Sequence, residues 1–194
     1  TPEGSLHLAW AETSISGNQV PQGIFYMNST DGGLTWSDPL VLAGPGNDWP
    51  RVVLSGSQIH LLYAQGSTDR ATLWERTRPL TGDAWSPAAR IPGWNEISLP
   101  FGATVDGMGE QSSLHLVGVD PEDGSYYYSL WHENNWSSVE KVTQSYGRNP
   151  GRGLLATTRL QGGKLVVAWL SQVDENGSQT TGAAEKVNQL FINT

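Results

Sequence analysis

Four stretches with the same apolar pattern recur along the chain at a nearly constant interval. They are Leu6-His7-Leu8-Ala9-Trp10, Ile59-His60-Leu61-Leu62-Tyr63, Leu114-His115-Leu116-Val117-Gly118 and Leu165-Val166-Val167-Ala168-Trp169, whose first residues are 53, 55 and 51 positions apart. A second series, Trp36-Ser37, Trp85-Ser86 and Trp136-Ser137, keeps spacings of 49 and 51. Two independent markers with one period predict a single supersecondary unit that is used about four times.

Each period is built from short runs that have the composition of β-strands. In the second period these runs are 50–54, 58–64, 71–76 and 86–91, and a proline marks strand entry at Pro50, Pro100 and Pro150. The runs are rich in β-branched and aromatic residues, and turn-forming residues bound them. We therefore predict an all-β propeller of about four four-stranded antiparallel blades in a single domain, with approximate blades 1–48, 49–98, 99–148 and 149–194.

The two ends of the repeat predict incomplete blades. The first repeat begins at its second strand, 6–11, and the last ends at its third strand, 187–193. Unpaired strand edges are templates for pairing with another chain. We therefore expect a partial propeller of about fourteen strands that is part of a larger chain or forms a homodimer.

Composition excludes several classes of function. The 194 residues carry a formal net charge of −8, so no basic stripe exists to meet the phosphates of nucleic acid or of an anionic membrane. The absence of cysteine excludes disulfides and zinc–thiolate sites. No apolar run approaches the length of a membrane span. We expect a secreted, extracellular protein, with the periplasm as the alternative.

The most specific motif is Ser29-Thr30-Asp31-Gly32-Gly33-Leu34-Thr35-Trp36. It resembles the Asp-box (BNR repeat) of the sialidase-like β-propellers at every defined position: Ser29, Asp31, Gly33, Thr35 and Trp36. The physical basis is a hairpin turn in which Asp31 accepts backbone hydrogen bonds and glycines supply positive φ. We expect Trp36 to be buried between neighbouring sheets. Degraded copies of the motif end at Trp85 and Trp136.

The resemblance also implies where catalytic residues would lie. Sialidases clamp a substrate carboxylate with three arginines and use a Tyr–Glu pair and an Asp in catalysis. Their first arginine belongs to an Arg-Ile-Pro motif on an inner strand. Here Arg90-Ile91-Pro92 follows Trp85, which predicts an outer strand, so we assign no catalytic residue.

Aromatic and basic residues near the strand entries form a candidate ligand site. They are Trp49, Arg51, Trp94, Tyr146, Arg148 and Arg152. Aromatic platforms beside charged groups suit the face and the carboxylate of a sugar. The alternative is that the tryptophans pack under loops and the arginines pair with acids.

The repeated histidines His7, His60 and His115 raise the question of a metal site. The fourth repeat has Val166 at this position, so packing or hydrogen bonding within each blade is the better interpretation. We expect no metal and no cofactor.

Two hypotheses remain. One is a non-catalytic propeller module that recognises carbohydrate or protein. The other is a fragment of an exo-sialidase or related glycoside hydrolase.

Overall fold

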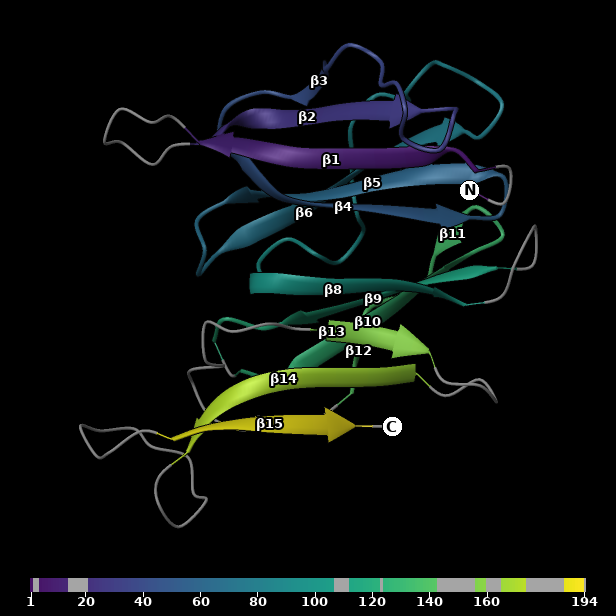
Figure 1. The fold of residues 1–194 in the computed structure, drawn as a ribbon. Helices are drawn as coiled ribbons and strands as arrows, with labels where there is room; N and C mark the ends of the chain where they lie inside the picture. Colours follow the sequence, from purple (N-terminus) through teal and green to yellow (C-terminus); the bar gives the residue numbers. More distant parts are fainter. Residues whose placement is uncertain are drawn as a thin grey trace.

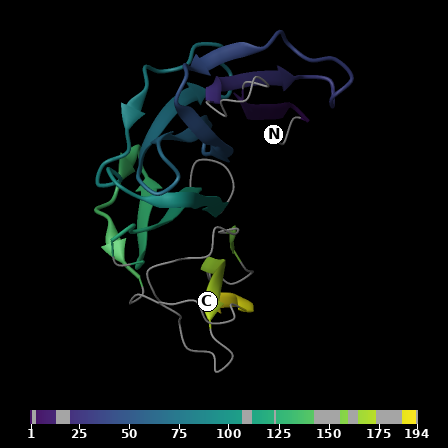
Figure 2. The same ribbon diagram turned by 90° about the vertical axis from the view of Figure 1, so that its left-hand side faces the viewer.

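The computed structural model describes residues 1, 4–12, 22–106, 112–122 and 124–142 with their side chains, and the backbone alone of residues 13, 21, 156–159, 165–173 and 187–193. The described chain forms four antiparallel sheets that follow one another in chain order around an open arc (Figures 1 and 2). In the described residues, no helix is long and apolar enough to cross a membrane.

The sheets are named here by their order in the chain. The first contains β1 (Leu6–Thr13), β2 (Pro21–Ser29) and β3 (Leu40–Ala43). The second contains β4 (Asn47–Ser55), β5 (Gln58–Gly66), β6 (Ala71–Pro79) and β7 (Ala89–Arg90). The third contains β8 (Ser98–Asp106), β9 (Ser113–Val119), β10 (Tyr126–His132), β11 (Asn135–Trp136) and β12 (Glu140–Lys141). The fourth contains β13 (Ala156–Arg159), β14 (Leu165–Val173) and β15 (Val187–Asn193).

Consecutive strands pair in every sheet, except that β12 pairs with β10 and not with β11, and the strands β4, β8 and β13 lie on the concave side of the arc (Figure 2). The first sheet begins at the strand equivalent to β5, and the fourth ends at its third strand. Both outcomes agree with the sequence pattern. The described strands form an arc rather than a closed ring.

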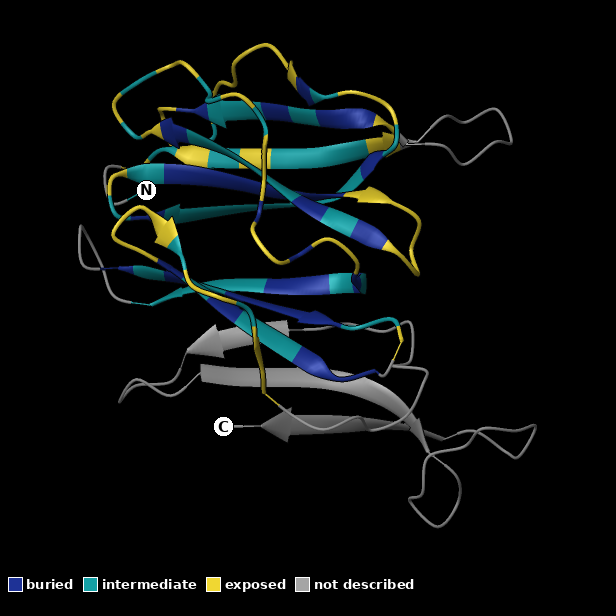
Figure 3. Cartoon of the chain, turned by 180° about the vertical axis from the view of Figure 1, so that it is seen from behind, coloured by how far each residue is buried: buried dark blue, intermediate teal, exposed yellow. Residues whose placement is uncertain are grey.

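The apolar core lies between neighbouring sheets, because both faces of β5 are buried (Figure 3). One cluster joins the first and second sheets and contains Ile24, Tyr26, Leu42, Leu61 and Tyr63. The other joins the second and third sheets, and its members include Leu62, Leu73, Phe101, Leu114 and Leu116. Alternation along the strand sends odd-numbered side chains of β5 to one cluster and even-numbered ones to the other. Each fully buried side chain of this kind contributes about 1.5–3 kcal/mol.

The Trp-Ser repeat closes an outer hairpin in each of the first three sheets. The serine Oγ accepts a hydrogen bond from a backbone N–H, and the serine N–H donates to the carbonyl of the same residue. The Oγ distances are 3.1, 2.9 and 2.9 Å for the pairs Ser37–Asn28, Ser86–Thr77 and Ser137–Leu130. The three repeats are therefore equivalent in hydrogen bonding as well as in sequence.

The repeated histidines are hydrogen-bonded within their own sheets. The Nδ1 atoms of His7, His60 and His115 lie 2.6, 2.6 and 2.9 Å from Tyr26 Oη, Glu75 Oε1 and Tyr128 Oη. These three partners occupy equivalent positions, opposite the second residue after each histidine. The interpretation as hydrogen bonding is confirmed, and the described residues contain no group of three metal-ligating side chains.

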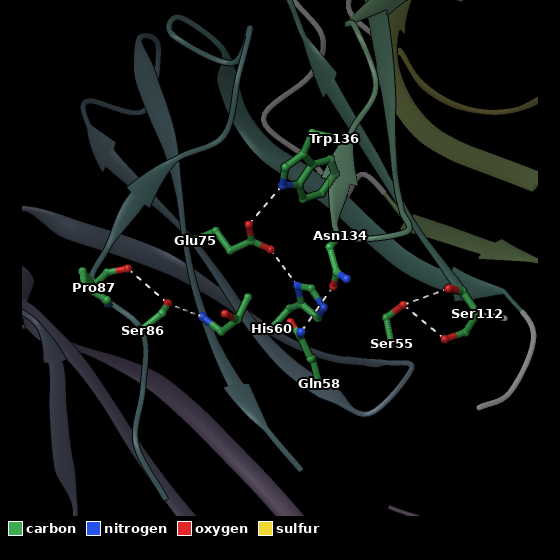
Figure 4. Close-up of polar contacts among 10 residues, drawn as sticks. Ser55, Gln58, His60, Glu75, Ser86, Pro87, Ser112, Asn134 and Trp136 are labelled. Carbon is green, nitrogen blue, oxygen red and sulfur yellow. Dashed lines mark hydrogen bonds and ion pairs between the residues drawn. The ribbon is translucent and has the colours of Figure 1, made fainter. Parts of the chain in front are cut away.

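Two of these partners, Tyr26 and Glu75, also contact the tryptophan of the next sheet. The Tyr26 ring meets Trp85 edge-on at 5.0 Å between centroids. Glu75 Oε2 accepts a hydrogen bond from Trp136 Nε1 at 3.0 Å (Figure 4). We call this repeated arrangement the His–acceptor–Trp contact. It joins the first sheet to the second and the second to the third.

The turn at residues 29–36 forms the hydrogen bonds that its residues predict. Asp31 Oδ1 accepts from the Thr35 N–H at 2.9 Å, and Asp31 Oδ2 accepts from the Thr35 hydroxyl at 2.6 Å. The buried Ser29 hydroxyl donates to Asp31 and accepts from the Gly33 N–H. Hydrogen bonds from Thr35, followed by that from Ser29, lower the pKa of Asp31 to about 2.

The predicted burial of Trp36 is wrong. Its side chain is 41% exposed, although it occupies the same repeat position as Trp85 and Trp136. Trp85 and Trp136 each pack against the sheet that precedes their own. No described sheet precedes the first one, so none of the sheets that the structure describes covers Trp36 as the neighbouring sheets cover Trp85 and Trp136.

Candidate functional site

Each of the inner strands β4 and β8 contains a bulge near its beginning. The register shifts between Asp48 and Arg51 in β4, and between Ser98 and Gly102 in β8. Pro50 lies inside the β4 bulge, where its missing N–H costs no ladder hydrogen bond. Pro100 occupies the matching place in β8. β-Bulges of this kind commonly re-aim side chains next to binding sites.

The β4 bulge holds Trp49 in an unusual backbone conformation. Its φ is +56°, a value that costs a bulky residue about 1–3 kcal/mol and that is concentrated at functional sites. The Trp49 N–H donates to Asp48 Oδ1 at 2.7 Å, which stabilises the turn. The bulge thus places the Trp49 ring beside Arg51, the next residue of β4 whose side chain faces the third sheet.

That side chain is Arg51, whose guanidinium lies between two aromatic rings. Arg51 Cζ is 6.0 Å from the centroid of the Trp49 ring and 5.7 Å from that of Phe101 on β8. Arg51 Nη1 donates to the carbonyl of Pro50 at 3.0 Å. A cation over two rings gains favourable electrostatic energy from both faces.

Arg51 is half-buried, and burial lowers its pKa. Within the described part of the chain, no carboxylate forms an ion pair with it, whereas Arg70 pairs with Glu96 at 2.6 Å. A partly desolvated guanidinium retains donors that match a planar carboxylate. The Arg51 guanidinium can therefore donate hydrogen bonds to an anionic group beside the two rings.

Trp94 does not contribute to this site. Its side chain is 1% exposed, and its Nε1 donates to the Ser129 hydroxyl at 2.8 Å. Gly118 provides the space for the ring, because a Cβ there would lie 2.5 Å from Trp94 Cζ3. The sequence-based placement of Trp94 at the ligand surface is corrected by this burial.

The remaining predicted residues, Tyr146, Arg148 and Arg152, lie outside the described residues. The structure brings Trp49 and Arg51 together and adds Phe101, which the sequence analysis missed. A signal for Phe101 existed, since it follows Pro100 as Arg51 follows Pro50.

Two cavities lie elsewhere between the second and third sheets. One of about 230 Å³ is lined by residues that include Trp94, Glu96 and Asp120. The other, of about 270 Å³, lies at the β4–β5 turn and is lined by residues that include Ser57, Gln58 and Asn134. Neither is lined by Arg51.

No family model and no curated protein matches this chain. Among solved structures, the chain is similar to a GH62 hydrolase crystallised in complex with xylotriose, with a TM-score of 0.53 and 15% sequence identity. The likeness covers 97% of this chain and 62% of the hydrolase, so the chain spans less than two thirds of that protein. At this identity, what the two proteins share is an all-β fold of antiparallel sheets.

Proposed function

We propose that this chain is a non-catalytic, sialidase-like β-propeller module that recognises an acidic saccharide at Trp49, Arg51 and Phe101. The observation that carries the proposal is the half-buried Arg51 guanidinium, which lies between two rings and has no ion-pair partner among the described carboxylates. A bidentate hydrogen bond to a carboxylate is stronger in such a partly dry site than in water. Aromatic rings offer the apolar surface on which sugar faces pack.

The position of Arg90 supports a non-catalytic role. Arg90 lies on the outer strand β7, where its guanidinium is 5.3 Å from the Trp74 ring centroid. The arginine of the Arg-Ile-Pro sequence therefore lies on an outer strand, as the sequence predicts, and Ile91 and Pro92 follow that strand. They do not supply the inner-strand arginine that sialidases use.

A glycoside hydrolase is the second candidate, and the likeness to the GH62 hydrolase favours it. Most glycosidases need two carboxyl groups that flank the scissile bond. The acidic residue next to the site in sequence is Asp48, whose Oδ1 is engaged by the Trp49 N–H. A hydrolase would therefore require carboxylates beyond this one.

Titration with 3′-sialyllactose, with lactose as the neutral control, tests the proposal. We expect sialyllactose to perturb the Trp49 indole and Arg51 side-chain NMR signals, and lactose to leave them unchanged. Arg51→Met keeps the apolar stem and removes the charge, so it should abolish binding. Arg70→Met removes an exposed arginine and should bind like the parent chain.

Turnover assays separate the two candidates. We expect hydrolysis of neither a fluorogenic sialoside nor xylotriose. Turnover by the parent chain that disappears in Arg51→Met would refute the non-catalytic hypothesis and support the hydrolase hypothesis. Equal binding of sialyllactose by the parent chain and by Arg51→Met would refute the assignment of the site.

A further inference from the structure

The outward face of the first sheet carries an apolar patch that no described residue covers. Leu6, Leu8, Trp36 and Val41 are 42%, 46%, 41% and 56% exposed. The patch is continuous near the turn at residues 29–36, where a Cβ on Gly33 would lie 3.2 Å from Leu6 Cδ1 and 4.0 Å from Trp36 Cζ2. We call these four residues the open face.

Equivalent residues in the next two sheets are fully buried. Ile59 and Leu61 occupy the positions of Leu6 and Leu8 in the second sheet, and both are 0% exposed. Leu114 and Leu116 occupy them in the third sheet and are also 0% exposed. In each case the preceding sheet provides the cover. The open face therefore has the composition of an interface that the molecule forms twice elsewhere.

The two existing interfaces define what would fit. Each covering sheet presents apolar side chains and one polar residue, Tyr26 or Glu75, that is held by a histidine and meets the next tryptophan. Trp36 is the tryptophan at this position in the first sheet. A matching surface must therefore carry a phenol or a carboxylate opposite Trp36.

We propose that the open face binds a further sheet of this same repeat, one that carries the histidine and its tyrosine or glutamate partner. This inference is independent of the proposed ligand site. The fourth sheet, whether from the same chain or from a second copy, is a poorer match. Its register pairs Ala168 with Ile192 at the position that Leu62 and Glu75 occupy in the second sheet, and Val166 stands in place of the histidine.

A fusion protein tests this proposal on the full chain. A copy of residues 47–106, which contains the second sheet and the inner strand β8, is joined before Thr1. The added β8 would fill the innermost position of the first sheet, and the added Glu75 would face Trp36. Hydroxyl-radical footprinting then compares the oxidation rate of Trp36 with that of Trp136 in the same molecule. We expect the Trp36 rate to fall to that of Trp136, and hydrogen exchange of the Trp36 indole N–H to slow.

Two matched variants make the result specific. Leu8→Asp on the open face should return Trp36 to its rate in the unfused chain. Glu75→Leu in the added copy alone should keep the slow oxidation but lose the slow exchange of the indole N–H. A second fusion with residues 98–159 offers Tyr128 as a phenol acceptor, in case the first fusion folds poorly.

Trp36 that stays as reactive in both fusions as in the unfused chain overturns the proposal. So does an unfused chain that self-associates in light scattering and already protects Trp36, because a second copy would then be the occupant. If the Trp36 indole N–H still exchanges slowly after Glu75→Leu in the added copy, the claim that the covering sheet must carry an acceptor opposite Trp36 is refuted.

Discussion

Replacing Glu75 by leucine removes a carboxylate that bonds to two different sheets. His60 is 0% exposed, and its Nδ1 lies 2.6 Å from Glu75 Oε1, while Trp136 Nε1 lies 3.0 Å from Oε2. An ionised carboxylate only accepts hydrogen bonds, so His60 Nδ1 carries the proton. The substitution therefore leaves two donors without an acceptor.

The expected loss follows from the burial of those donors. An orphaned buried donor costs about 1–3 kcal/mol, and the half-buried indole of Trp136 takes the smaller share. We expect Glu75→Leu to lower the free energy of unfolding by about 3 kcal/mol. For a chain of this length, that loss corresponds to a fall in melting temperature of roughly 6–12 °C.

The repeat itself provides the matched control. Tyr26 and Tyr128 occupy the position of Glu75 in the neighbouring sheets, and both bond to a histidine. Glu75→Tyr should therefore keep a partner for His60 and cost less than half as much as Glu75→Leu. Urea unfolding followed by circular dichroism measures both variants. A cost for Glu75→Leu within about 0.5 kcal/mol of zero, typical of surface changes, or an equal cost for the two variants would refute the reasoning.

Two further outcomes are expected at other positions. The Asp31 carboxyl should titrate near pH 2 in NMR, because Thr35 bonds to its charged form. Since this pKa lies below the ordinary value of 3.8, its contribution to stability is present above pH 4 and is lost as pH falls toward 2. Asp31→Asn should remove that pH dependence, and an Asp31 midpoint near 3.8 would contradict the turn geometry. Gly118→Ala should cost about 1–3 kcal/mol in urea unfolding, because its Cβ would overlap Trp94. Gly44→Ala, where a Cβ meets no atom within 4 Å, is the control and should be near neutral.

Local pattern predicted the strands and the hairpins, because those depend on residues close in sequence. The Trp-Ser hairpins occur where the repeat places them. Pro50 and Pro100 lie at equivalent positions, but at the register shifts within β4 and β8 rather than at the strand entries that the sequence predicts. The prediction that Trp36 is buried was wrong because its burial depends on a neighbouring sheet and not on nearby residues. A tryptophan at that position is covered only when a sheet precedes it, and the motif itself does not contain that information.

The candidate site was predicted in part. Trp49 and Arg51 meet because one bulge contains both, and a proline in the sequence marks that bulge. Phe101 joins them from the next inner strand, which requires knowing how two sheets pack. Trp94 was placed at the surface because its partners Ser129 and Gly118 are distant in sequence.

The His–acceptor–Trp contacts have a consequence for how the protein opens. Each contact joins one sheet only to its neighbour, so stability behaves as a sum of nearest-neighbour couplings along a row of units. The second sheet is coupled on both sides, through Trp85 to the first sheet and through Glu75 to the third. Opening at either side leaves the other coupling intact, so β5 should be the last strand to lose amide protection. We expect the first sheet to separate without disturbing the contact between the second and third sheets, so that it opens as an independent unit of the arc.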